Sequence, residues 1–134
     1  MKKTLLTIAI VFAVALVASL GVEAKKEAKA SAAFAVKTHD FGNIKEANGP
    51  VSCEFTFTNA GSGNLIIYDA TAECGCTRPE YPKNPIAPGK SGKIKVTYNP
   101  AGRPGAFEKT VTVKANGKPS KIRLKIKGNV IPKR

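Results

Sequence analysis

From Phe34 onward, apolar residues alternate with polar ones in short runs that are separated by Gly, Pro and Asn. Alternation with a period of two places one set of side chains on each face of an extended strand, whereas a helix needs a spacing of three to four. The pattern therefore predicts six or seven short strands and no helix. The runs cover residues 34–41, 51–58, 64–72, 93–98, 109–114 and 121–130.

Turn signals lie between these runs. Asn116 and Gly117 separate two alternating runs, which is a strong hairpin signal. Parallel pairing is disfavoured, because no helical segment is available to carry the chain from one parallel strand to the next. The sequence therefore predicts an all-β, antiparallel sandwich of about seven strands, in which each of two sheets buries one face. Further turn signals are Gly61, Gly63, Pro88-Gly89 and Pro104-Gly105.

Alternation also assigns the faces of the strands. In residues 51–58, Cys53, Phe55 and Phe57 share one face, and we expect that face to be buried. Cys53 is therefore predicted to be a core residue rather than an exposed thiol.

The last run carries a ladder of positive charges on its outer face. Its inward-facing residues are Ile122, Leu124 and Ile126, and the ladder consists of Lys121, Arg123, Lys125 and Lys127. One interpretation is a contact site for a polyanion. The alternative that we favour is an edge strand that lysine protects from pairing with another chain, or a plain solvated face.

The N-terminal segment has the pattern of a secretory signal peptide over residues 1–24. Two lysines precede an apolar stretch, and Val22-Glu23-Ala24 offers small residues at a cleavage site. A second site follows Ala30. An uncleaved anchor is the alternative, because residues 4–22 are nineteen residues without a charge, close to the roughly 20 that span a bilayer.

Cleavage after residue 24 would leave 110 residues, enough for one domain and too few for two. We expect residues 25–33 to form a flexible leader and residues 34–134 to form the folded domain. The exported chain would not be an integral membrane protein. Its expected location is the periplasm or cell envelope of a bacterium, or the medium outside.

Charge narrows the choice of partners. The chain without residues 1–24 keeps 20 basic and 8 acidic residues, a net charge of +12. Such a charge attracts acidic partners over long distances. In an exported setting these are an anionic glycan, a lipid headgroup surface or an acidic protein of the cell envelope. Nucleic acid is disfavoured, because export separates the chain from it and the basic residues are not interleaved with exposed aromatics.

Several short motifs occur in a fixed order along the chain. They are Asp40-Phe41-Gly42, Phe55-Thr56-Phe57-Thr58-Asn59, Leu65-Ile66-Ile67, Cys74-Gly75-Cys76-Thr77, Pro88-Gly89-Lys90-Ser91-Gly92 and Gly128. Over residues 34–131 this order resembles the bacterial family called domain of unknown function 1573. The resemblance implies an immunoglobulin-like fold of the hydin and major-sperm-protein type in exported bacterial proteins. It implies no catalytic residue and no cofactor.

Cys74 and Cys76 are the candidate disulfide or thiol site. Residues two apart on a flat strand have α-carbons about 6.6 Å apart, near the upper end of the range of about 4.4 to 6.8 Å for disulfides. Gly75 permits a bend that shortens this span. Three arrangements stay open: Cys74 bonded to Cys76, Cys53 bonded to one of them, or three free thiols. Pairing of Cys53 is feasible only if the second and third runs lie in opposite sheets.

Other chemistry finds less support in the sequence. Cys74 and Cys76 could bind a copper(I) ion as two thiolate ligands. A closed zinc site needs four ligands, and His39 and Cys53 are the only further candidate ligands in the sequence after residue 24. No phosphate loop, zinc-protease helix or nucleophile elbow occurs. We therefore assign no metal, no cofactor and no catalytic residue.

These observations favour a non-catalytic binding or structural module of the bacterial cell envelope, making protein or polyanion contacts. The alternative is a thiol redox-sensing or soft-metal protein that uses Cys74 and Cys76. A third hypothesis is an adaptor that accepts a partner strand at an open sheet edge.

Overall fold

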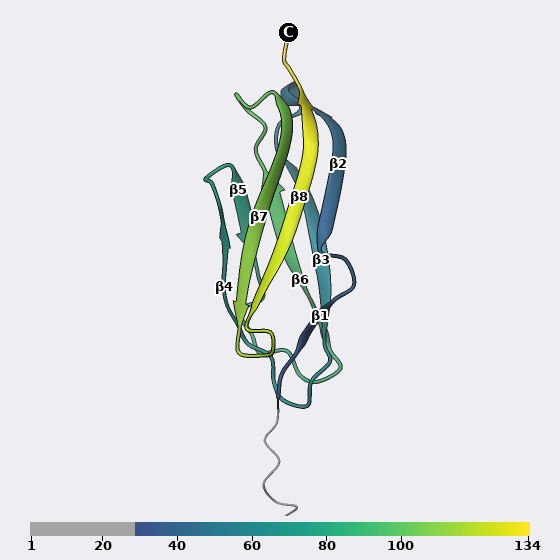
Figure 1. The fold of residues 1–134 in the computed structure, drawn as a ribbon, viewed down its shortest axis with the longest axis vertical. Helices are drawn as coiled ribbons and strands as arrows, with labels where there is room; N and C mark the ends of the chain where they lie inside the picture. Colours follow the sequence, from purple (N-terminus) through teal and green to yellow (C-terminus); the bar gives the residue numbers. More distant parts are fainter. Residues whose placement is uncertain (1–28) are drawn as a thin grey trace, which may run out of the picture.

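Eight strands form two four-stranded sheets that pack face to face (Figure 1). The structure is a computed structural model and describes residues 29–134. The first sheet has the order β1-β3-β6-β5 and the second the order β2-β8-β7-β4. The strands are β1 (Ala32–Phe34), β2 (Thr38–Lys45), β3 (Val51–Asn59), β4 (Ile67–Ala72), β5 (Thr77–Glu80), β6 (Ser91–Tyr98), β7 (Gly105–Ala115) and β8 (Lys121–Ile131), and one 3-10 turn covers Glu46–Asn48. The predicted all-β sandwich is confirmed.

The first predicted run divides into two strands that belong to different sheets. β1 pairs with β3 in the first sheet, whereas β2 pairs with β8 in the second. Between them Val36 is 60% exposed, because the chain there crosses from one sheet to the other. Alternation alone could not reveal this crossing.

The pairing of β2 with β8 is parallel, which the expected antiparallel sandwich did not include. Thr38 lies opposite Lys125 and Ile44 opposite Val130, with an irregularity between Asp40 and Asn43. No crossover helix is needed, because the chain passes through β3 to β7 before it returns beside β2. The remaining strand pairs are antiparallel.

The alternation pattern did not predict β5, because this strand is short and contains Pro79. Proline cannot donate a hydrogen bond to a neighbouring strand, so it is tolerated mainly at sheet edges. β5 is such an edge strand and pairs with β6 alone. This short segment has no alternation of apolar and polar residues, so the sequence did not indicate a strand there.

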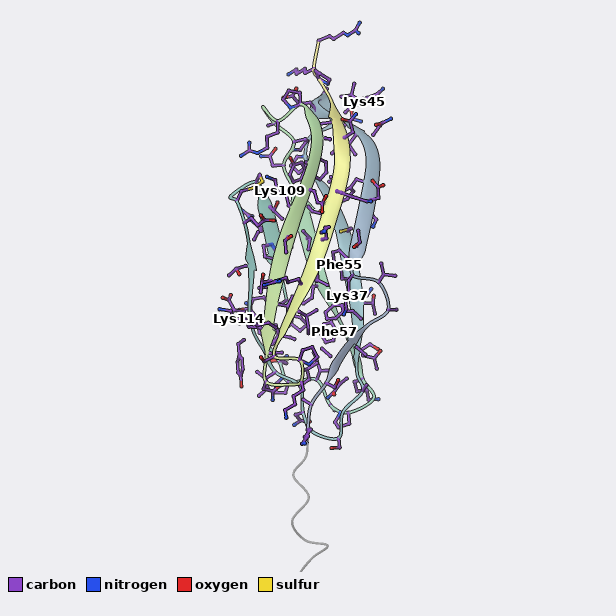
Figure 2. All side chains as sticks on the ribbon, viewed as in Figure 1. Lys37, Lys45, Phe55, Phe57, Lys109 and Lys114 are labelled. Carbon is purple, nitrogen blue, oxygen red and sulfur yellow. A yellow bond between two sulfur atoms is a disulfide. The ribbon has the colours of Figure 1, made fainter. Side chains whose placement is uncertain are left out.

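The predicted core faces are confirmed. Cys53, Phe55 and Phe57 are buried along β3, as are the three inward residues of β8. Figure 2 shows Phe55 and Phe57 between the sheets. At the other end of the sandwich, Tyr98 stacks on Phe107 with ring centroids 3.9 Å apart. Burial of this apolar face supplies most of the driving force for folding.

The folded domain begins earlier than expected, because residues 29–33 of the predicted flexible leader 25–33 belong to it, while residues 25–28 lie outside the described residues. Ala30 and Ala32 are buried, and β1 starts at Ala32. The Lys29 carbonyl accepts hydrogen bonds from Ser62 N at 2.7 Å and Gly63 N at 3.2 Å. Small side chains allow this close backbone packing, and for the same reason the segment lacks the large apolar residues that would predict a strand. The predicted signal peptide lies outside the described residues.

The hairpin at Asn116 and Gly117 occurs, but it is a longer loop than a two-residue turn. It links β7 to β8, and Ala115 N donates to Ser120 O at 2.9 Å. Gly117 is required by close packing, because a Cβ there would lie 2.7 Å from the Ala30 carbonyl oxygen. The loop thus helps to hold the N-terminal segment.

Candidate functional site

The basic ladder of β8 lies on a central strand, not on an edge. β8 is flanked by β2 and β7, so the explanation that its lysines protect an edge is wrong. Sequence patterning could not show this, because it gives the faces of a strand but not its neighbours. The edges are β1, β5, β2 and β4. The lysines of β8 therefore give no information on whether an edge is open.

In one half of the ladder, at Lys125 and Lys127, neighbouring carboxylates offset the positive charge. Lys125 Nζ lies 2.7 Å from Glu108 Oε1, and the hydrogen bond and charge of Lys125 hold the pKa of that carboxyl below its usual value. The register places Lys127 between Asp40 of β2 and Glu108 of β7. These two members of the predicted ladder therefore contribute little uncompensated charge.

The other half gathers cations from three segments. Lys121 lies opposite Lys114 of β7, and Arg123 opposite Thr112. Lys125 N donates to Lys37 O at 2.8 Å, which holds Lys37 beside β8. We call Lys37, Lys114, Lys121 and Arg123 the basic cluster.

The basic cluster borders a shallow hollow of about 440 Å³. Its lining consists of Lys37, Pro119, Lys121, Ile122 and Arg123, with no carboxylate among them. Asp69 of β4 is the nearest acidic neighbour in the register, opposite Lys114. Figure 2 shows Lys37 and Lys114 toward the lower end of the second sheet and Lys45 at the upper end. Lysines occur at both ends of this sheet, but the lining of this hollow contains no carboxylate.

The sequence missed two members of this cluster. Lys114 could have been found, because the hairpin that follows it sets the register that places it opposite Lys121. Lys37 gave no such signal, because its position depends on the crossing of the chain between the sheets.

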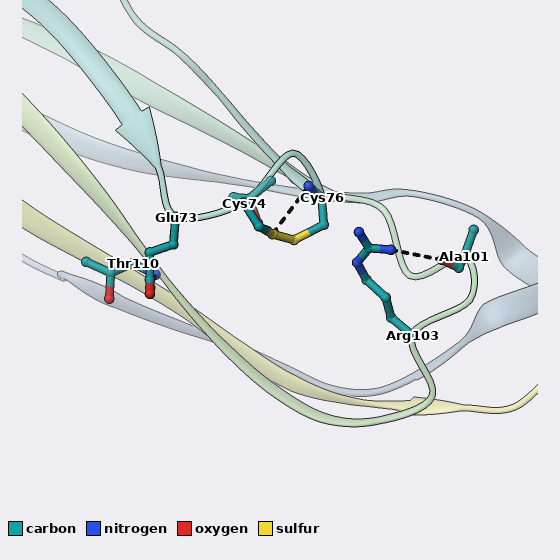
Figure 3. Close-up of a disulfide and its surroundings, with 7 residues drawn as sticks. Glu73, Cys74, Cys76, Ala101, Arg103 and Thr110 are labelled. Carbon is teal, nitrogen blue, oxygen red and sulfur yellow. Dashed lines mark hydrogen bonds between the residues drawn. A yellow bond between two sulfur atoms is a disulfide. The ribbon is translucent and has the colours of Figure 1, made fainter.

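Cys74 and Cys76 are joined by a disulfide in the segment that connects β4 to β5 (Figure 3). This segment carries the chain from the edge of one sheet to the edge of the other. The α-carbons are 5.3 Å apart, shorter than on a flat strand. Cys74 is half-buried and Cys76 is buried. The bend at Gly75 therefore places one sulfur near solvent and the other toward the core.

Hydrogen bonds fix the backbone of this corner on both sides. Thr77 N donates to Cys74 O at 3.3 Å, and Asn99 N donates to Cys76 O at 2.9 Å. Cys76 N lies 3.3 Å from Cys74 Sγ, and Thr77 Oγ1 lies 3.4 Å from Cys76 Sγ. The corner is therefore held by main-chain contacts in addition to the disulfide.

Cys53 remains a free thiol. β3 and β4 lie in opposite sheets, the arrangement in which a bridge was conceivable, but Cys53 is unpaired and buried. Burial raises the pKa of its thiol to about 11. Cys53 is therefore protonated at neutral pH and behaves as an apolar core residue.

The remaining candidates take part in no cluster. His39 packs its ring edge-on against Phe41, with centroids 4.6 Å apart. Within residues 29–134, no three His, Cys, Asp or Glu side chains are placed to share a metal ion. In the same range no helix has the length and apolar character to cross a membrane.

Asn59 is a structural hub that sequence reasoning did not identify. Its side chain is fully buried and makes four hydrogen bonds. Oδ1 accepts from Ser31 N at 3.3 Å and Gly61 N at 3.0 Å, while Nδ2 donates to Gly63 O at 2.8 Å and Ile86 O at 2.9 Å. Three chain segments meet at this amide, namely Ser31, the stretch from Asn59 to Gly63, and Ile86, so the asparagine of the Phe-Thr-Phe-Thr-Asn motif has a structural role.

Comparison with known proteins identifies one family and a shared fold. The model of a family described as protein of unknown function (DUF1573) matches residues 32–130. No curated protein matches the chain. A protein of unknown function from Porphyromonas gingivalis W83 superposes with a TM-score of 0.62 at 14% identity, over 76% of this chain and 46% of that protein. The chain thus spans about half of that protein's length.

Two further structures show the same architecture. The ASH/PapD-like domain 7 of human CEP192 has a TM-score of 0.62 at 13% identity, over 77% of this chain and 87% of that domain. The VesB protease of Vibrio cholerae has a TM-score of 0.56 at 17% identity, over 76% of this chain and 31% of the protease. At such identities the likeness concerns the fold alone, and it confirms the immunoglobulin-like class.

Proposed function

The chain belongs to the DUF1573 family of proteins of unknown function, and from that premise we propose that it is an exported, non-catalytic binding module of the bacterial cell envelope. Its partner is an anionic glycan or lipid surface, and the contact is the basic cluster. The proposal assigns no catalytic residue and no cofactor. The signal-like pattern of residues 1–24 supports export.

The observation that carries the proposal is the uneven distribution of charge on the second sheet. Lys125 and Lys127 face carboxylates, whereas the hollow beside Lys37, Lys121 and Arg123 is lined by no acid. Clustered cations attract a polyanion more strongly than the same charges spread over a surface, because several of them act within one Debye length of about 8 Å. Each Lys or Arg near an anionic lipid surface contributes about 1 kcal/mol.

Neutralising the basic cluster tests this contact. We expect the variant Lys37→Gln, Lys114→Gln, Lys121→Gln, Arg123→Gln to bind anionic vesicles or an immobilised carboxylated glycan at least about a hundredfold more weakly, since four contributions near 1 kcal/mol are lost. Binding is measured by co-sedimentation with vesicles and by retention on the glycan at two salt concentrations. Binding of the unmodified chain should weaken as salt rises.

A matched control separates the cluster from overall charge. The variant Lys45→Gln, Lys90→Gln, Lys95→Gln, Lys133→Gln removes the same charge at exposed positions elsewhere. We expect it to bind several-fold more strongly than the cluster variant. Equal losses in both variants would show that net charge, and not this site, determines binding. Comparing vesicles with glycan then distinguishes a lipid surface from a polysaccharide.

A further inference from the structure

The disulfide corner between β4 and β5 is open to an incoming reagent. Gly75 is exposed, and no atom lies within 4 Å of the position that a Cβ would occupy there. A hollow of about 270 Å³ adjoins Gly75 and Cys76, and both Arg78 and Glu80 belong to its lining. Space beside Gly75 is therefore available to an incoming thiol.

The two sulfur atoms differ in burial, and this difference sets the direction of attack. Thiol–disulfide exchange requires a thiolate to approach one sulfur while the other leaves. Cys74 is half-buried, whereas only 5% of Cys76 is exposed. Cys74 Sγ is therefore the more accessible sulfur for an incoming thiolate, and Cys76 Sγ is the leaving atom.

The leaving sulfur has a hydroxyl beside it. Thr77 Oγ1 lies 3.4 Å from Cys76 Sγ, and Thr77 is 4% exposed. Within the part of the chain that the structure describes, this is the only hydrogen bond of the Thr77 side chain. A disulfide sulfur is a weak acceptor, but a thiolate is a strong one, so this bond strengthens as the S–S bond breaks.

The hollow carries one charge of each sign, Arg78 and Glu80, and a further cation lies at the corner. Figure 3 shows the Arg103 side chain extending from the β6–β7 loop toward the disulfide, while Glu73 points toward Thr110. Glu73 Oε1 accepts a hydrogen bond from Thr110 N, which holds the carboxylate away. A nearby guanidinium stabilises a developing thiolate.

The fold does not depend on this disulfide for long-range cross-linking. A bond between residues two apart removes little conformational entropy from the unfolded chain. The hydrogen bonds of Thr77 N and Asn99 N hold the same corner without it. The reduced domain should therefore stay folded with its two sulfurs still close together.

We infer that Cys74 and Cys76 form a thiol–disulfide exchange site that accepts two electrons from a partner protein carrying two thiols. One partner thiolate attacks Cys74 Sγ, the Cys74–Cys76 bond breaks, and Cys76 leaves as a thiolate that takes up a proton. The second partner thiolate then attacks the partner's own sulfur in the mixed disulfide and releases Cys74. The partner leaves oxidised to a disulfide, and Cys74 and Cys76 are left as two thiols.

Reduction of the folded chain by glutathione tests the site directly. We expect glutathione to reduce the disulfide while the circular dichroism spectrum is unchanged. Acid quenching and peptide mass spectrometry should locate the transient glutathione adduct on Cys74, with Cys53 unmodified. Reduction only after unfolding, or adducts divided equally between Cys74 and Cys76, would overturn the inference.

Single-thiol variants test the asymmetry. In Cys76→Ser the remaining Cys74 thiol should react with oxidised glutathione at least about tenfold faster than the Cys76 thiol in Cys74→Ser, because burial shields the Cys76 sulfur from the incoming reagent. Equal rates would contradict the assigned roles.

Thr77 is a positioning residue in this scheme, and its role has its own test. Thr77→Val removes the hydroxyl at nearly constant volume and should slow glutathione reduction by about tenfold, the usual effect of losing a hydrogen bond to a charged group. Thr77→Ser should restore the rate. An unchanged rate in a folded Thr77→Val would remove the hydroxyl from the mechanism.

Discussion

Replacing Asn59 with alanine is expected to lower the free energy of unfolding by about 4 kcal/mol. The substitution leaves two backbone N–H groups and the Gly63 carbonyl without the partner that the buried Asn59 amide provides, whereas the Ile86 carbonyl keeps its hydrogen bond from Leu65 N. Each unsatisfied buried group costs about 1 to 3 kcal/mol, and relaxation recovers part of the total. Urea unfolding followed by circular dichroism measures the change.

Two further variants make the Asn59 result specific. Asn64 lies a few residues away and is exposed, and its carbonyl accepts a bond through the backbone, so Asn64→Ala should change stability by less than about 0.5 kcal/mol. Asn59→Asp should be at least as damaging as alanine at neutral pH, because a buried carboxylate would face the carbonyls of Gly63 and Ile86. A small loss in Asn59→Ala would show that water replaces the amide.

Gly61→Ala is expected to detach the N-terminal segment from the domain. A methyl group at this position overlaps the Lys29 carbonyl oxygen, which is backbone and cannot rotate away. The segment must move, and it would lose the hydrogen bonds that Lys29 O accepts from Ser62 N and Gly63 N. Overpacking of this kind costs about 3 kcal/mol.

Hydrogen exchange locates the effect of this substitution. We expect faster exchange over β1 and at Ala60 N, which donates to Ser31 O, while β7 and β8 keep their protection. Gly75→Ala is the matched control, because its Cβ position is open, and it should change stability by less than about 0.5 kcal/mol. Unchanged exchange in β1 would show that the segment tolerates the extra methyl group.

The sequence predicted those parts of the fold that depend on local alternation. Phe55, Phe57 and Leu124 are buried as expected, because a period of two fixes which face of a strand is apolar. It could not predict that β2 lies beside β8, because pairing between distant strands depends on how the two sheets close together. The wrong edge assignment of β8 has the same origin.

For the candidate sites, the residue types could be recognised from the sequence, but their surroundings could not. Lys125 and Lys127 looked equivalent to Lys121 and Arg123, and only the register shows that Glu108 and Asp40 lie beside the first pair. The Cys74-Gly75-Cys76 motif indicated a short bond, but the unequal burial of its two sulfurs depends on the crossing between sheets. Asn59 was missed because a polar residue at the end of a strand is usually solvated.

The parallel pairing of β2 and β8 determines how the domain would carry tension. The described chain starts at one end of the long axis, below β1, and finishes at the other (Figure 1). A pull between these ends runs along the strands, so β2 and β8 are drawn in opposite directions and their hydrogen bonds are loaded in shear. Bonds loaded in shear share the force, whereas bonds peeled from one end break one after another. The sandwich therefore has the strand arrangement of a stiff mechanical link, with β1 as its most easily released part, because it pairs with β3 over only three residues.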